Sequence, residues 1–186
     1  MAGNAEVLTR RAQEIVVVAR ALLERGGPEA LSMRAVAGEL GIQAPSLYNH
    51  LPDKAALEAA IIASGFIELD EVFATALAGA SDPLAALADA YRGWGRAHPH
   101  LYRLSTDRPL PRDRLAPGVE EGPARVVVDA CGGDPDAARA VFAFAHGMVM
   151  LELADRFPPG ADIDAAWRSG IAAFRPEHKK RKKRKR

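Results

Sequence analysis

Apolar residues recur along most of the chain three or four positions apart, the spacing that lines up one face of an α-helix. No stretch alternates between apolar and polar residues for long enough to indicate a β-strand. Glycine and proline divide the chain into segments of helix length. The pattern therefore predicts an all-α fold. In the first helix, expected over residues 5–25, the apolar face consists of Ala12, Ile15, Val16, Ala19, Leu22 and Leu23.

Helix starts and ends are marked by particular residues. Ser32, Asp53, Asp82 and Asp134 are suited to cap helix N-termini, and a proline directly follows each of the last two. The run Gly26-Gly27-Pro28 is expected to end the first helix. These positions predict eight or nine helices, over residues 5–25, 33–40, 45–51, 53–78, 83–97, 99–106, 120–131, 134–156 and 162–174.

The composition narrows the class of protein. Nearly half of the 186 residues are apolar, enough for a substantial hydrophobic core. The single cysteine, Cys131, excludes an internal disulfide and fits a reducing compartment. The first residues lack the apolar segment of a secretory signal, and no apolar run approaches the roughly 20 residues that span a bilayer. We therefore expect a cytoplasmic protein without a membrane partner.

The charge is distributed unevenly. Residues 179–186 are all basic, and without them 17 basic residues face 24 acidic ones, a net charge of −7. Such a run of like charge is expected to be disordered, and it could add DNA phosphate contacts without sequence preference. A nuclear-localisation stretch and an altered C-terminus are alternative interpretations of the same run.

Two short predicted helices, residues 33–40 and 45–51, are joined by a turn at Gly41 and match a helix-turn-helix. In the second helix, the spacing divides the side chains between two faces. The inward positions are Ala44, Leu47 and Leu51, and the outward ones are Pro45, Tyr48 and Asn49. A compact outward face of this kind can enter the major groove of DNA, where base edges are distinguishable.

Two basic side chains are expected in the first turn of a helix, where the helix dipole disfavours a positive charge. Lys54 is expected in the first turn of the helix over residues 53–78, and Arg34 in the first turn of the helix over residues 33–40. A DNA phosphate bound at these helix ends would explain both choices, because the backbone N–H groups and the cation would hold the same anion.

The segment over residues 41–54, GIQAPSLYNHLPDK, resembles the signature of the TetR family of bacterial transcriptional regulators. The resemblance covers about residues 9–62, and the length and helical content of the remainder are similar to those of the family. It implies a helix-turn-helix DNA-binding domain over residues 1–54 and a helical ligand-binding and dimerisation domain over residues 55–175. Residues 176–186 would be a disordered basic tail.

The resemblance also implies an activity and assigns residues to it. A TetR regulator of the usual kind is a homodimer that represses from palindromic operator DNA and is released by a small effector, here an unknown molecule. Dimerisation also follows from the short recognition helix, which reads few bases alone. The family's base-contacting positions fall on Arg34, Ala44, Pro45 and Asn49, its phosphate-contacting positions on Tyr48, His50 and Lys54, with Ser32 capping nearby and Gln43 just before the recognition helix.

Structural roles remain open for several of these residues. Tyr48 could simply cover the helix pair, and His50 could pack against it or cap it. Pro45 is accounted for by helix initiation alone, and Lys54 could be an ordinary solvated lysine.

The resemblance says less about the larger domain. The helices over residues 134–156 and 162–174 are implied to form a four-helix bundle with a second copy. Ala140, Ala143, Ala145 and Gly147 would allow close approach there, or they would pack within the chain. Trp94, His98, Pro99, Tyr102 and His146-Gly147 resemble a TetR subgroup named for Trp, His and Gly positions, WHG.

Several aromatic, histidine and methionine side chains could line an apolar effector pocket, and plain core packing is the alternative. The predicted pocket residues are Trp94, His98, Tyr102, Phe142, His146 and Met150, with Met148 and Trp167 beside them.

Enzyme motifs are missing: the chain has no Gly-rich phosphate loop, no G-x-S-x-G and no H-E-x-x-H. Cys131 has no companion at metal-ligand spacing. We therefore expect no enzyme activity, no metal and no cofactor. Two alternative functions remain. One is a sequence-nonspecific DNA-binding protein that uses its basic tail, and the other is a small helical binding protein or enzyme with a chance hairpin.

Overall fold

The computed structural model describes residues 8–175, and these residues form nine α-helices and one 3-10 helix. The predicted all-α fold is thereby confirmed for this part of the chain. The basic tail lies outside the described residues, so its predicted disorder is not addressed. The α-helices are α1 (Arg10–Ala30), α2 (Met33–Glu39), α3 (Ala44–Tyr48), α4 (Lys54–Leu77), α5 (Pro83–Ala97), α6 (Pro99–Thr106), α7 (Glu121–Ala130), α8 (Pro135–Leu153) and α9 (Ile163–Ala173), and η1 is the 3-10 helix Arg112–Arg114.

The four predicted N-caps are confirmed, because each side-chain oxygen accepts a hydrogen bond from a backbone N–H in the first turn of its helix. For Ser32, Asp53, Asp82 and Asp134, respectively, the donors are Ala35, Ala56, Ala85 and Ala137, at 3.1, 2.6, 3.1 and 3.2 Å. Most helix limits therefore agree with the sequence prediction to within a few residues.

Several boundaries differ from the prediction, and the end of α8 at Leu153 rather than at residue 156 is one of them. The first helix begins at Arg10 rather than at residue 5, because Thr9 caps it through Ala12 N. It breaks at Gly27, where φ is 71°, but Pro28 then opens one further turn that reaches Ala30. The helix α3 ends at Tyr48, earlier than predicted, and the 3-10 turn η1 lies in a segment expected to be irregular.

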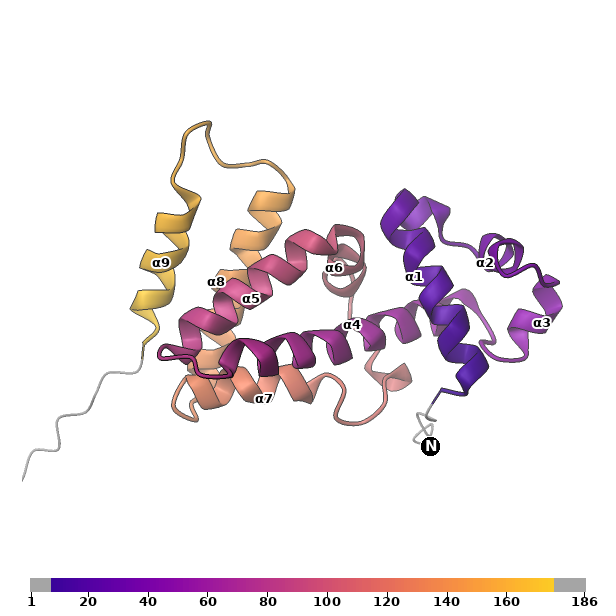
Figure 1. Cartoon of the computed structure of the whole chain (residues 1–186), viewed down its shortest axis with the longest axis horizontal. Helices are drawn as coiled ribbons and strands as arrows, with labels where there is room; N and C mark the ends of the chain where they lie inside the picture. Colours follow the sequence, from indigo (N-terminus) through magenta and orange to yellow (C-terminus); the bar gives the residue numbers. More distant parts are fainter. Residues whose placement is uncertain (1–7, 176–186) are drawn as a thin grey trace, which may run out of the picture.

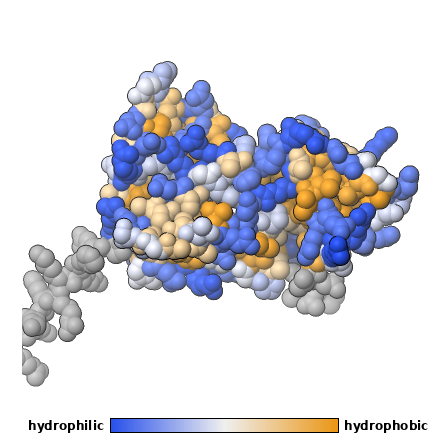
Figure 2. Space-filling view, viewed as in Figure 1, coloured by the Kyte–Doolittle hydropathy of each residue, from blue (hydrophilic) through white to orange (hydrophobic). Residues whose placement is uncertain are grey.

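The first three helices and the start of α4 form a small bundle at one end of the molecule (Figure 1). We call residues 8–54 the head and residues 55–175 the body. All six apolar residues predicted on one face of α1 are buried. They pack with fully buried side chains of α2, α3 and α4, namely Val36, Leu47 and Leu57. In Figure 2, strongly hydrophobic residues gather on the face of the head around α1 and α2, and a paler hydrophobic patch lies on the body among hydrophilic residues.

The long helix α4 joins the head to the body and packs against α1, α5, α6 and α7. Farther from the head, α8 packs against α5, α7 and α9 (Figure 1). Of the small residues predicted at a dimer contact on α8, Ala140 and Ala143 are exposed, and open space lies beside Gly147. Ala145 is buried within the chain. Among the described residues, no helix is both long enough and apolar enough to cross a bilayer.

Candidate functional site

The helix-turn-helix positions α3 by a tight turn after α2. Gly41 adopts a φ of 64°, and Ile42 N donates to Ala37 O at 3.0 Å, which satisfies a carbonyl at the end of α2. Leu47 and Leu51 are 0% and 3% exposed, so the predicted inward face of α3 is anchored in the head. The helix is thus held by one side, and its opposite side is left free.

The outward face of α3 carries the side chains predicted to meet DNA. Pro45 and Tyr48 are exposed on the helix, and Asn49 follows as an exposed C-cap residue with helical backbone angles. Ala44 is half-buried, so of the predicted inward residues it is the least enclosed. Side chains that can donate, accept and stack are therefore presented together on the exposed side of α3, the kinds of group that read base edges in a major groove.

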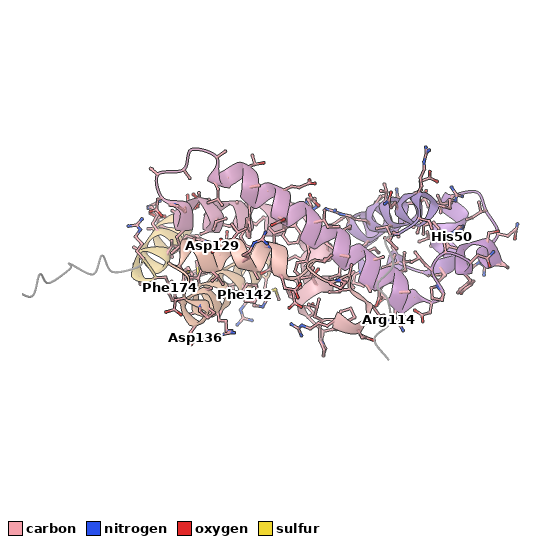
Figure 3. All side chains as sticks on the ribbon, turned by 90° about the horizontal axis from the view of Figure 1, so that it is seen from below. His50, Arg114, Asp129, Asp136, Phe142 and Phe174 are labelled. Atoms are coloured by element: carbon pink, nitrogen blue, oxygen red, sulfur yellow. The ribbon has the colours of Figure 1, made fainter. Side chains whose placement is uncertain are left out.

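The flanking predicted residues lie at helix ends around α3. Arg34 in the first turn of α2 is exposed, and so are Gln43 and His50 on either side of α3. His50 lies at the end of the molecule that the head forms (Figure 3). Lys54 begins α4, with half of its side chain exposed and its Nζ 3.6 Å from Glu58. The N-termini of α2 and α4 thus each combine a cation with backbone N–H groups, the arrangement that suits phosphate.

One contact at this surface was not predicted from the sequence. Arg114 of η1 lies with its Nη1 3.1 Å from Oδ1 and 3.3 Å from Oδ2 of Asp53, the N-cap of α4. The N–H of Ala56 and then the Arg114 guanidinium hold the pKa of the Asp53 carboxyl below its ordinary value. Sixty-one positions separate the two residues, and no local pattern indicates that they meet.

The predicted pocket residues of the body partly come together, but as a packed cluster. Tyr102 of α6 lies at its centre, 1% exposed, with its hydroxyl 2.9 Å from the hydroxyl of Tyr91 and 2.8 Å from Nδ1 of His146. The rings of Tyr102 and Phe142 each stack on His146. The centroid of the Trp94 ring is 6.2 Å from that of Tyr102. We call these five residues the aromatic cluster.

Burial changes the acidity of the cluster's hydroxyls. It raises the pKa of Tyr91 to about 12, with the hydrogen bond to Tyr102 acting in the opposite direction. Burial and the neighbouring Tyr91 raise the pKa of Tyr102 further. Both hydroxyls are therefore neutral at ordinary pH and serve as hydrogen-bond donors or acceptors. Tyr91 was missed by the sequence prediction, although it shares the buried face of α5 with Leu84, Leu87, Ala88 and Trp94.

One polar atom of the cluster lacks a partner. Trp94 is only 8% exposed, and its Nε1 has no hydrogen-bond acceptor in the described part of the chain. Because buried donors normally find an acceptor, this N–H is a candidate contact for a bound molecule.

Other predicted pocket residues lie outside the aromatic cluster. His98 forms the corner between α5 and α6 and faces the head, with its Nε2 3.2 Å from Glu68 and its Nδ1 4.0 Å from Glu24. It therefore lies outside the aromatic cluster, although its ring centroid is 5.9 Å from that of Trp94. Met148 is buried and Met150 half-buried in the hydrophobic core. Trp167 of α9 donates instead to Glu152, at 2.6 Å.

Two open grooves occur elsewhere on the body. One, of about 380 Å³, lies between α4 and the segment that leads into α7, beside Phe66, Ile67 and Asp70. The other, of about 700 Å³, lies between α5 and α9 and includes Trp167 as its single predicted pocket residue. Within the described residues, no group of three or more His, Cys, Asp or Glu side chains could hold a metal ion.

Two family models match the chain. Residues 15–61 match the model for bacterial regulatory proteins of the tetR family, and residues 84–174 match the model for the tetracyclin repressor-like C-terminal domain. The second match spans the residues that carry the WHG resemblance, namely Trp94, His98, Pro99, Tyr102 and His146-Gly147.

Individual relatives agree with these matches. The uncharacterized HTH-type transcriptional regulator Rv0681 of Mycobacterium tuberculosis is 30% identical over 151 residues, covering 76% of this chain and 69% of that protein. The HTH-type transcriptional regulator Rv1816 of the same organism is 28% identical over 122 residues, and the match spans 63% of this chain and 52% of that relative. Both relatives are named as HTH-type transcriptional regulators, the class of protein that the sequence predicts.

Solved structures share the fold. The regulatory protein SCO4313 superposes with a TM-score of 0.72 at 25% identity, covering 89% of this chain and 95% of that one. The TetR family member SCO1917 of Streptomyces coelicolor A3 gives 0.68 at 24% identity, covering 90% and 99%.

Proposed function

The chain belongs to the TetR family of transcriptional regulators, and from this premise we propose that it is a ligand-responsive repressor. It binds palindromic operator DNA as a homodimer through the outward face of α3, and a small effector releases it. The observation that carries the proposal is the exposed set Pro45, Tyr48 and Asn49, held outward by the buried Leu47 and Leu51.

The chemistry of this surface supports sequence readout. Asn49 can pair bidentately with an adenine, and Pro45 and Ala44 offer apolar contact to a thymine methyl. Arg34 and Lys54 at helix N-termini, with Tyr48 and His50 beside them, would hold phosphates and fix the register. Two heads about 34–36 Å apart would read two half-sites of a palindrome.

The decisive experiment is selection of bound genomic fragments by the full chain, followed by gel shifts with competitor DNA. We expect a palindromic site that resists excess unrelated DNA. Asn49→Ala should weaken that site at least tenfold, because a good base contact contributes about 1–3 kcal/mol in each half-site. Thr75→Ala, a small polar change on the exposed surface at the far end of α4, is the matched control and should bind as wild type.

The alternatives give different results. Affinity that hardly depends on sequence and disappears when residues 178–186 are removed would indicate nonspecific binding through the tail. Absence of DNA binding at physiological salt would indicate the small helical binding protein or enzyme. Unchanged site preference in Asn49→Ala would contradict readout through α3.

An exposed stripe on α8 supports dimerisation. Ala140, Ala143 and Gly147 follow each other at helical spacing on the outer side, and Leu151, which is 43% exposed, continues the same side of the helix. Small residues let two helices approach closely, and the apolar side chains would be covered by a second copy. Ala143→Arg should convert the dimer to monomer in sedimentation velocity, whereas Ala124→Arg on the exposed side of α7 should not. Equal behaviour of the two variants would exclude this face.

The aromatic cluster supports an effector with an apolar body and at least one hydrogen-bond acceptor. The Nε1–H of Trp94 would bind the acceptor, while Tyr91, Tyr102 and His146 exchange one of their internal hydrogen bonds for a bond to the ligand. Once a compound that releases the operator is found, Trp94→Phe should raise its half-effective concentration about tenfold. Trp167→Phe is the control, because its Nε1 already donates to Glu152. An unchanged response in Trp94→Phe would indicate that the effector binds at another site.

A further inference from the structure

A residue of the body reaches the end of α4 that carries the DNA-contacting residues of the head. Arg114 belongs to η1, and its guanidinium lies against both carboxylate oxygens of Asp53. Asp53 immediately precedes Lys54, the residue assigned to phosphate. Figure 3 shows Arg114 beside α4 near the head, well apart from Phe142 and Asp136 at the opposite end of the body.

The formal charges at the N-terminus of α4 sum to zero only when Arg114 is included. Lys54 supplies one positive charge, and it lies 3.6 Å from the carboxylate of Glu58. Asp53 adds a second negative charge that cannot turn away, because its Oδ1 caps α4 through Ala56 N at 2.6 Å. Without Arg114 the group has a net charge of −1, and a phosphate would meet repulsion at the place where the helix N–H groups would attract it.

We propose that Arg114 supports DNA binding from the body, by cancelling the charge of Asp53 at the phosphate-contacting end of α4. The inference rests on the proposed function, since it concerns the same DNA surface. Arg114 acts through Asp53 and is thus an electrostatic positioning residue, separate from the base-reading residues of α3.

The ion pair has little other purpose in the folded chain. The side chains of Arg114 and Asp53 are 39% and 51% exposed, and exposed pairs contribute little to folding stability. Such a pair matters more when a third charged group binds beside it. A phosphate is repelled by a lone carboxylate, and this repulsion is removed when a guanidinium neutralises the carboxylate.

Arg114 is held by its own segment of the body. Arg112 donates to both carboxylate oxygens of Glu120, at 2.8 and 2.6 Å, and Leu115 is buried. The same segment continues through Pro117 to Val119, which line the groove beside Phe66 and Ile67 of α4. A change in the body that displaces this segment would therefore remove the cation from Asp53 and weaken DNA binding.

The test is operator binding by Arg114→Gln, measured by fluorescence anisotropy over a range of salt. We expect binding about three- to tenfold weaker at low salt, from a surface charge effect at each of two heads. The loss should shrink as salt rises and the Debye length falls below about 10 Å. Arg114→Lys keeps the charge and should bind nearly as wild type.

A double variant separates charge from geometry. Asp53→Asn retains an oxygen that can cap α4 but removes the charge. Asp53→Asn combined with Arg114→Gln should therefore restore affinity, because the local charge returns to its original value. If Arg114 instead touched DNA directly, or served only to fasten the segment, the double variant would bind as weakly as Arg114→Gln, and the proposal would be wrong.

Arg125→Gln on the exposed side of α7 is the matched control, since it makes the same change of charge on the body without touching the Arg112–Glu120 pair that holds the segment of Arg114. It should bind as wild type, and an equal loss would show an effect of net charge alone. Circular dichroism and sedimentation of each variant exclude misfolding as a cause. If wild type itself binds no operator, the proposed function fails and this inference with it. If wild type and Arg114→Gln bind equally, only the inference is contradicted.

Discussion

The surface of the head that we propose to bind DNA and the aromatic cluster of the body both contain tyrosine and histidine, but they are built in opposite ways. The head's predicted residues fall within residues 32–54, and all but the half-buried Ala44 are exposed. The cluster's residues come from α5, α6 and α8, and most of them face one another. A tyrosine at 47% exposure, Tyr48, is available to a partner, whereas one at 1%, Tyr102, already has its partners.

This difference indicates where each region can change. The head presents groups whose hydrogen bonds are open to DNA, so binding needs little rearrangement. In the cluster, the hydroxyls bond to each other and to His146, so an effector must replace existing contacts. We therefore propose that the body is the region where effector binding is coupled to a change of structure.

The largest expected difference between the two regions is in the effect of replacing a tyrosine by alanine. Tyr102→Ala should lower the free energy of unfolding by about 3–5 kcal/mol, because a large side chain leaves the core and Tyr91 loses a partner. Tyr48→Ala should change it by no more than about 0.5 kcal/mol while weakening operator binding. Urea unfolding at fixed protein concentration measures the first effect, and anisotropy measures the second. A large stability loss in Tyr48→Ala would mean that the tyrosine covers the helix pair.

A smaller effect tests the burial of Tyr91. Its pKa is raised to about 12, above the value of 10 for an exposed tyrosine. A raised pKa means that this residue's contribution to stability is complete below pH 10 and is lost as the pH rises toward 12. Tyrosinate absorbance after rapid pH jumps should show one group titrating near 12 that Tyr91→Phe removes. Titration of that group near 10 in the folded protein would show that the cluster is open to water.

The smallest expected effect is on the pKa of Asp53 in the head, which Arg114 of the body contacts. The pKa of Asp53 lies below its ordinary value of 3.8, first because Ala56 N–H donates to it and then because Arg114 is near. Asp53 therefore favours the folded state at higher pH, and this contribution is lost as the pH falls through the lowered pKa. In Arg114→Gln, a carboxyl NMR titration should show a small rise that leaves the pKa below 3.8. A return to the ordinary value would mean that the cap depends on Arg114.

Most of the fold could be predicted because its determinants are local. Helical periodicity and N-caps operate within about four residues, so the segments beginning after Ser32, Asp53, Asp82 and Asp134 were placed correctly. The errors at Thr9 and after Gly27 have the same origin, since a neighbouring cap or proline shifts a boundary by one turn.

The candidate sites show the same difference between local determinants, which can be predicted, and long-range ones, which cannot. The outward side of α3 could be predicted because the positions of Leu47 and Leu51 fix which way the helix turns. The position of His98 could not be predicted, because it depends on how the start of α6 packs beside Glu24 of α1 and Glu68 of α4. Helical spacing marks His98 as near the buried face of α5, but it does not say which helix packs there.

By itself, the sequence determined the helical segments within residues 8–175, four of their N-caps and the outward side of α3, because each depends on residues within a turn or two of one another. Only the tertiary structure decided that the aromatic cluster is closed around Tyr102, that Glu24 accepts from Leu101 N, and that Arg114 meets Asp53. Those contacts join residues 44 to 77 positions apart, and they are fixed by how whole helices pack, which no local pattern encodes.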